Sequence, residues 1–275
     1  MPDTQHVPTA AYGILDRDRF DSDIDEIAEQ VRRVGYAVLD AGLDSGRLAV
    51  LRDAFEQARG RYIAAHGEAR LRALNEYHTV RAPLLHGGPE FLQLVFNDRL
   101  IATLRRLIAG QFILNQQNGV INPPGEKYSQ GQWHRDLPYQ HFVSSRPLAI
   151  NALFCVDDFT AQNGSTLVLP ASHKAEAFPS EAYVRANALQ VTAPAGHFIL
   201  LDCMTFHTGG FNASPNERRA INHVFTIPYF RQQIRIPGNL APATFSTEQR
   251  QILGFRNVEP ASVDAYFTGR EETLP

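Results

Sequence analysis

The sequence predicts a mainly β fold with helical additions, built around an antiparallel sandwich or barrel. Between residues 112 and 230, short apolar runs alternate with turn clusters such as residues 122–125 and 163–165. No helical pattern alternates with these runs, which argues against a parallel sheet. Helical periodicity dominates the residues before this region instead.

The first third of the chain is predicted to be mainly helical. Polar residues 21–23 can cap a helix whose apolar positions recur at helical spacing, and Gly35 marks its end. A short strand is expected over residues 36–39. Further amphipathic helices are expected from about residue 44 and over about residues 90–108.

The remaining elements follow from the same patterns. A loop or short helix is expected over residues 171–194 and a helix over residues 246–253. We expect a single domain over residues 1–275, in which residues 1–110 are mainly helical support, residues 111–230 form the β core and residues 231–275 cover it. The expected core strands are residues 112–121, 148–156, 165–169, 196–202 and 220–228.

Composition limits the function classes. The 275 residues include 26 Lys and Arg against 29 Asp and Glu, a net charge of -3, so nucleic acid and acidic membrane surfaces are not expected partners. The two cysteines, Cys155 and Cys203, each lie in an apolar stretch, which favours buried thiols in a reducing compartment. No apolar run approaches the ~18 residues of a membrane span. We expect a cytoplasmic protein, either a monomer or a homodimer.

One motif indicates a metal site. His134 and Asp136 are two residues apart, so on an extended strand their side chains point to the same side. His207 follows 73 residues later, directly after an apolar run. Two imidazoles and one carboxylate with open positions opposite are the ligand set of non-haem Fe(II) oxygenases, although zinc accepts the same ligands.

An arginine favours the oxygenase interpretation. Arg218 lies 11 residues after His207 at the start of a β run. Its planar guanidinium can bind the distal carboxylate of a dicarboxylic acid with two hydrogen bonds. Arg219 competes for this role, because strand alternation allows only one of the two to face inward.

These motifs resemble the phytanoyl-CoA dioxygenase-like (PhyH) family of Fe(II)/2-oxoglutarate-dependent oxygenases, over roughly residues 112–230. The matching stretches are residues 122–125, 133–136, 163–165 and 169–174, together with His207 and Arg218. The resemblance implies a double-stranded β-helix, a cupin-like jelly roll, flanked by N-terminal helices. It implies His134, Asp136 and His207 as iron ligands, Arg218 as the anchor of the C5 carboxylate of 2-oxoglutarate, and O2 as the oxidant.

The chain differs from the family next to His207, the second histidine of the predicted ligand set. Family members often have a serine two residues after it, where this chain has Gly209, and Thr208 is expected to substitute. Gln117 and Asn151 are further candidates for binding 2-oxoglutarate, with an outward-facing polar residue as the alternative for each. The candidates for the substrate pocket are Arg135, Tyr139, Trp133 and Asn222, with simple packing as the alternative for Trp133.

The resemblance therefore predicts a dioxygenase that hydroxylates or otherwise oxidises a small-molecule metabolite, as in secondary-metabolite tailoring, and releases succinate and CO2. Desaturation, epoxidation, ring closure and epimerisation start from the same chemistry, and a carrier- or CoA-linked substrate is also open. Two other classes use the same fold or ligands: a non-catalytic jelly-roll binding protein and a metal-dependent hydrolase.

Overall fold

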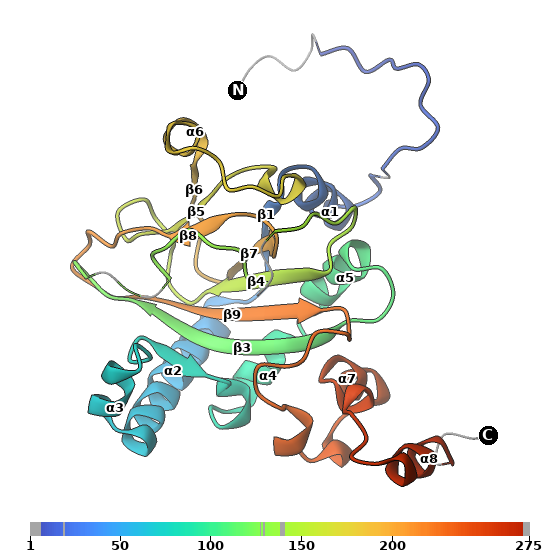
Figure 1. Cartoon of the computed structure of the whole chain (residues 1–275). Coiled ribbons are helices and arrows are strands. Elements are labelled where there is room, and N and C mark those ends of the chain that lie inside the picture. Colours follow the sequence, from blue (N-terminus) through green and yellow to red (C-terminus); the bar gives the residue numbers. More distant parts are fainter. Residues whose placement is uncertain (1–6, 19, 127, 129, 138–140, 272–275) are drawn as a thin grey trace.

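Two antiparallel β-sheets, one of six strands and one of three, form the centre of the molecule (Figure 1). The computed structural model describes residues 7–18, 20–126, 128, 130–137 and 141–271. The large sheet has the strand order β1-β7-β4-β9-β3-β2 and the small sheet the order β6-β5-β8. The strands are β1 (Tyr36–Asp40), β2 (Thr79–Arg81), β3 (Ile113–Asn122), β4 (Ala149–Cys155), β5 (Thr166–Val168), β6 (Leu189–Val191), β7 (His197–Asp202), β8 (His207–Gly209) and β9 (Arg218–Thr226).

The two sheets face each other across an apolar layer. Ile199 and Leu201 of β7 and Ala220 of β9 are buried in one cluster with Val168 of the small sheet and Val191 of β6. This arrangement confirms the predicted mainly β, jelly-roll fold. Because side chains alternate along each strand, every second residue of β4, β7 and β9 points into the space between the sheets.

Helices cover the opposite face of the large sheet (Figure 1). Phe154 of β4 and Phe225 of β9 are fully buried there with Phe55 of α2 and Leu104 of α5. Gly119 of β3 permits this packing, because a Cβ on it would lie 2.9 Å from the Phe55 ring. The helices are α1 (Asp23–Val34), α2 (Ser45–His66), α3 (Glu68–Ala73), α4 (Pro89–Val95), α5 (Asp98–Leu107), α6 (Glu181–Asn187), α7 (Thr247–Ile252) and α8 (Val263–Glu271), and the 3-10 turns are η2 (Pro83–Leu85), η3 (Ser172–Lys174), η4 (Pro237–Asn239), η5 (Pro242–Thr244) and η6 (Phe255–Asn257).

Most predicted elements are present, and their ends have identifiable caps. Ser22 caps α1 through a hydrogen bond to the Asp25 amide, and Gly35 ends this helix with a φ of 87°. The helix expected over residues 90–108 is wrong as a single element. Asn97 accepts from the Leu100 amide and begins a second helix there, so the segment forms α4 and α5.

Within the described residues, no helix is both long enough and apolar enough to cross a membrane.

Candidate metal centre

His134, Asp136 and His207 come together at the edge of the small sheet. The backbones of His134 and His207 exchange two hydrogen bonds, of 3.0 and 3.1 Å, so residue 134 pairs with β8 as an additional strand position. Asp136 Oδ1 lies 3.8 Å from His134 Nε2 and 3.7 Å from His207 Nε2. The potential ligand atoms of all three residues lie within 4.8 Å of one another, which is close enough to hold one ion.

Hydrogen bonds orient both imidazoles for metal binding. His134 Nδ1 lies 2.6 Å from the Gln132 carbonyl, and His207 Nδ1 lies 3.0 Å from the Thr205 carbonyl. A carbonyl can only accept, so each Nδ1 carries the proton and each Nε2 presents a lone pair toward Asp136. Burial lowers the pKa of His207, which favours the neutral form that binds a metal.

Asn151 of β4 orients the carboxylate of the triad. Its Nδ2 donates to Asp136 Oδ2 at 2.8 Å. The other oxygen, Oδ1, is the one nearest to both histidines. The donor set and its supporting hydrogen bonds therefore fit a divalent metal ion held by two imidazoles and one carboxylate.

A small cavity of about 40 Å³ lies beside the triad, between the two sheets. Arg218 lines it together with His134 and His207, and the residue is 3% exposed. The guanidinium stacks on the Phe159 ring, with Cζ 3.8 Å from the ring centre, and donates one hydrogen bond from Nη2 to the Tyr128 hydroxyl at 3.3 Å. Among the residues that the structure describes, Arg218 Nε and Nη1 have no acceptor.

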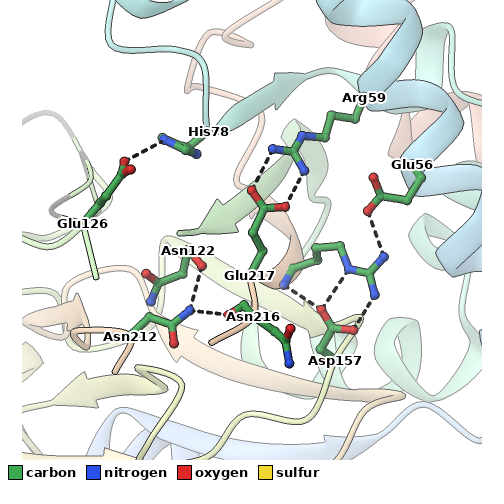
Figure 2. A network of polar contacts seen from close by, with 10 residues as sticks. Glu56, Arg59, His78, Asn122, Glu126, Asp157, Asn212, Asn216 and Glu217 are labelled. Atoms are coloured by element: carbon green, nitrogen blue, oxygen red, sulfur yellow. Dashed lines mark hydrogen bonds and ion pairs between the residues drawn. The ribbon is translucent and has the colours of Figure 1, made fainter. Parts of the chain in front are cut away.

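An unpaired buried guanidinium is energetically costly, so this cavity is suited to an anion. The adjacent Arg219 does not share this environment. Its Nη2 donates to Asp157 at 2.7 Å and its Nη1 to Glu56 of α2 at 2.8 Å. Figure 2 shows Asp157 and Glu56, which lie on the helix-covered face of the large sheet, next to the pair formed by Arg59 and Glu217.

The other residues expected to bind the cosubstrate lie at different places. Asn151 lines the cavity, where it donates to Asp136. Gln117 of β3 instead lies on the helix-covered face, where its Nε2 bonds to the Phe91 carbonyl and to His223. Thr208 lies between His207 and Gly209 in β8, so its side chain points to the opposite side from theirs. Its hydroxyl donates to the Gln130 and Gly209 carbonyls, and the residue does not line the cavity.

The residues expected in the substrate pocket also separate. Asn222 lines the cavity, and its Oδ1 is buried with no donor within the described parts of the chain. Trp133 packs beside Phe178, with ring centres 6.1 Å apart, in agreement with the packing alternative. Tyr139 lies outside the described residues.

Arg135 points away from the cavity, although it lies between two of the triad residues. It is 2% exposed, and Phe206 lies against its guanidinium with the ring centre 4.0 Å from Cζ. The guanidinium donates to four carbonyl groups, those of Met204, Ser172, Ala175 and Glu176. Its role is therefore to hold the η3 turn and the loop before β8 together beneath the triad.

Tyr128 is a cavity residue that no sequence motif indicates. It is 9% exposed, lines the cavity and accepts the hydrogen bond from Arg218. Its location depends on the pairing of the segment around Gln130 with β8, which is a contact between residues far apart in the chain.

Comparison with known sequences identifies a family. The family model described as phytanoyl-CoA dioxygenase (PhyH) matches residues 31–220. The uncharacterized protein Rv1501 of Mycobacterium tuberculosis is 30% identical over 259 residues, which cover 91% of this chain and 94% of that protein.

Solved structures share the fold. The epimerase SnoN, in complex with Fe3+, alpha ketoglutarate and nogalamycin RO, aligns with a TM-score of 0.57 at 21% identity over 83% of this chain and 93% of its own. EctD from S. alaskensis, with 2-oxoglutarate and 5-hydroxyectoine, aligns with a TM-score of 0.60 at 22% identity over 75% of this chain and 77% of its own.

Proposed function

Since the chain belongs to the phytanoyl-CoA dioxygenase family, we propose that it is an Fe(II)- and 2-oxoglutarate-dependent dioxygenase acting on a small-molecule metabolite. His134, Asp136 and His207 would hold the iron, and Arg218 would bind the C5 carboxylate of 2-oxoglutarate. When bound, iron and 2-oxoglutarate supply the activation of O2 that oxidises a C–H bond of the substrate, with succinate and CO2 as the coproducts.

One observation supports this proposal above the others. The buried guanidinium of Arg218, with two nitrogens that have no acceptor in the described part of the chain, shares a cavity with His134 and His207. One carboxylate of a dicarboxylic acid would supply an acceptor for this guanidinium, while its other end lies next to the metal ligands. A hydrolase that uses the same three ligands has no use for this arginine.

The chain's own residues would perform three tasks. The carbonyls of Gln132 and Thr205 hold both imidazoles in the metal-binding tautomer, and Asn151 holds Asp136. The two sheets exclude water from Arg218, which strengthens its attraction for a carboxylate. His134 is the most open of the three ligands, with 27% of its side chain exposed against 8% for His207, so the substrate would approach from its side.

The proposed substrate class is a tailored secondary metabolite. SnoN, which shares the fold, is an epimerase from nogalamycin biosynthesis. The regiochemistry and the outcome, hydroxylation or another oxidation, would be determined by the side chains on the His134 side.

The test is an anaerobic titration of the protein with Fe(II) and 2-oxoglutarate. A 2-oxo acid chelated to Fe(II) produces a weak visible charge-transfer band, and we expect this band in the wild type. Arg218→Ala should require at least about tenfold more 2-oxoglutarate, because the variant loses charge-assisted hydrogen bonds.

Arg219→Ala is the matched control, since it removes the neighbouring guanidinium from the outer face of the same strand. It should titrate as the wild type does. Absence of the band from iron-loaded wild-type protein would contradict the proposed function, and an equal effect of both substitutions would contradict the role of Arg218.

A further inference from the structure

The Tyr128 side chain occupies the space in front of Gly209. A Cβ atom on residue 209 would lie 1.8 Å from the Tyr128 hydroxyl oxygen and 2.8 Å from Tyr128 Cζ, far closer than two non-bonded atoms can approach. The tyrosine therefore fits only because position 209 has no side chain. His207 and Gly209 are two residues apart in β8 and face the same side, so Tyr128 fills the position next to the candidate metal ligand.

Backbone hydrogen bonds hold Tyr128 in this place. The Gly209 amide donates to the Gln130 carbonyl at 2.8 Å, and the Gly131 amide donates to the Tyr128 carbonyl at 3.0 Å. The ring packs in the apolar layer between the sheets, and Tyr128 is 9% exposed. The hydroxyl thus has a defined position beside Arg218 in the cavity wall.

The hydroxyl is available as a donor. It accepts from Arg218 Nη2 at 3.3 Å, and among the described residues the hydroxyl donates no hydrogen bond of its own. Burial raises the pKa of Tyr128, so the proton is retained at neutral pH although Arg218 opposes this shift. Tyr128 and Arg218 therefore line the same cavity with one hydroxyl donor and two guanidinium nitrogens that have no acceptor among the described residues.

We propose that Tyr128 is a second binding residue for the distal carboxylate of 2-oxoglutarate. Its hydroxyl, which comes from a segment distant in the sequence, takes the place of the serine hydroxyl that family members often have at position 209. This inference rests on the proposed function. A carboxylate in the cavity accepts from the Arg218 guanidinium on one side and from the Tyr128 hydroxyl on the other. The pair selects 2-oxo acids that carry a second carboxylate.

The test compares cosubstrate binding by the wild type and Tyr128→Phe, both loaded with Fe(II) under anaerobic conditions and titrated with 2-oxoglutarate while the charge-transfer band is monitored. Loss of a hydrogen bond to a charged group should raise the dissociation constant about tenfold or more. Tyr62→Phe, which removes a hydroxyl from helix α2 remote from the cavity, is the matched control and should bind as the wild type does. Thermal unfolding of the apo proteins checks that the folds are equally stable.

Two further measurements separate direct binding from a packing effect. With 2-oxopentanoate, which lacks the distal carboxylate, wild type and Tyr128→Phe should bind within about twofold of each other. In the Tyr128→Ala background, adding Gly209→Ser should recover part of the lost 2-oxoglutarate affinity, because the space that the ring vacates then holds a serine hydroxyl.

The outcomes distinguish the two proposals. If the iron-loaded wild type does not bind 2-oxoglutarate, the proposed function fails and this inference fails with it. If the wild type binds and Tyr128→Phe binds equally tightly, or loses the same factor with 2-oxopentanoate, only the role of Tyr128 is overturned.

Discussion

Asn151 and Asp136 are joined by a hydrogen bond of 2.8 Å that leaves one carboxylate oxygen, Oδ1, toward the two histidines. The amide comes from β4 in the large sheet, whereas the carboxylate lies beside the small sheet. This bond therefore connects the two sheets at the metal centre and determines which oxygen is free to bind.

Replacing Asn151 by leucine should weaken metal binding about 10- to 100-fold, as is typical when a partner of a metal ligand is lost. The measurement is calorimetric titration of the apo protein with Fe(II) under anaerobic conditions. Asn222→Leu is the control, because Asn222 lines the same cavity but has no hydrogen bond to Asp136. Equal metal affinity of Asn151→Leu and the wild type would show that Asp136 does not depend on this bond.

Arg135→Met should be strongly destabilising. The substitution keeps an apolar stem but leaves four carbonyls without the buried guanidinium that now donates to them. The two fully buried bonds, to Met204 and Ser172, come from a charged donor and contribute about 1.5–3 kcal/mol each, so we expect a loss of at least about 3 kcal/mol in the free energy of unfolding. Urea denaturation measures it.

Arg185→Met is the control for Arg135→Met, since Arg185 forms an exposed pair with Glu181 in α6. It should change stability by no more than about 0.5 kcal/mol. A loss below about 1 kcal/mol in Arg135→Met would contradict the structural role of this arginine.

Asp157→Asn should lower the free energy of unfolding and leave the cosubstrate site intact. Asp157 accepts from the side chain and the backbone amide of Arg219, and both side chains are 21% exposed. Loss of this partly buried bidentate pair should cost about 1–2 kcal/mol in urea denaturation. The 2-oxoglutarate titration should not change, because Arg219 points to the outer face. A large loss of cosubstrate affinity with unchanged stability would instead assign Arg219 a part in binding.

The parts of the fold that could be predicted are those encoded by neighbouring residues. Ser22, Asp44 and Ser246 cap the helices that their sequence context indicates. The three-residue strands β2 and β6 were not predicted, because nothing in their own sequences indicates a strand and each becomes one only by pairing with another segment.

The same distinction applies to the site. His134 and Asp136 share a strand-like segment, so their spacing is informative. The period of two also implies that Gly209, not Thr208, faces the same side as His207. Tyr128 could not be predicted in this way, because its position depends on the missing side chain of a residue 81 positions later in the sequence.

His223 should make stability depend on pH. It is fully buried, with Nδ1 donating to the Ala152 carbonyl at 3.1 Å and Nε2 accepting from Gln117 at 2.9 Å, so the neutral ring satisfies both contacts. Burial lowers its pKa to about 4. An unfolded histidine has a pKa of about 6.5, so between these values the unfolded state binds more protons than the folded state. The stabilisation is therefore complete above about pH 6.5 and decreases as the pH falls toward about 4.

The measurement is urea denaturation in the presence of a metal chelator. Between pH 7 and pH 5, the free energy of unfolding of the wild type should fall by about 2 kcal/mol more than that of His223→Gln. Equal losses in the two proteins would mean that His223 does not resist protonation in the folded state.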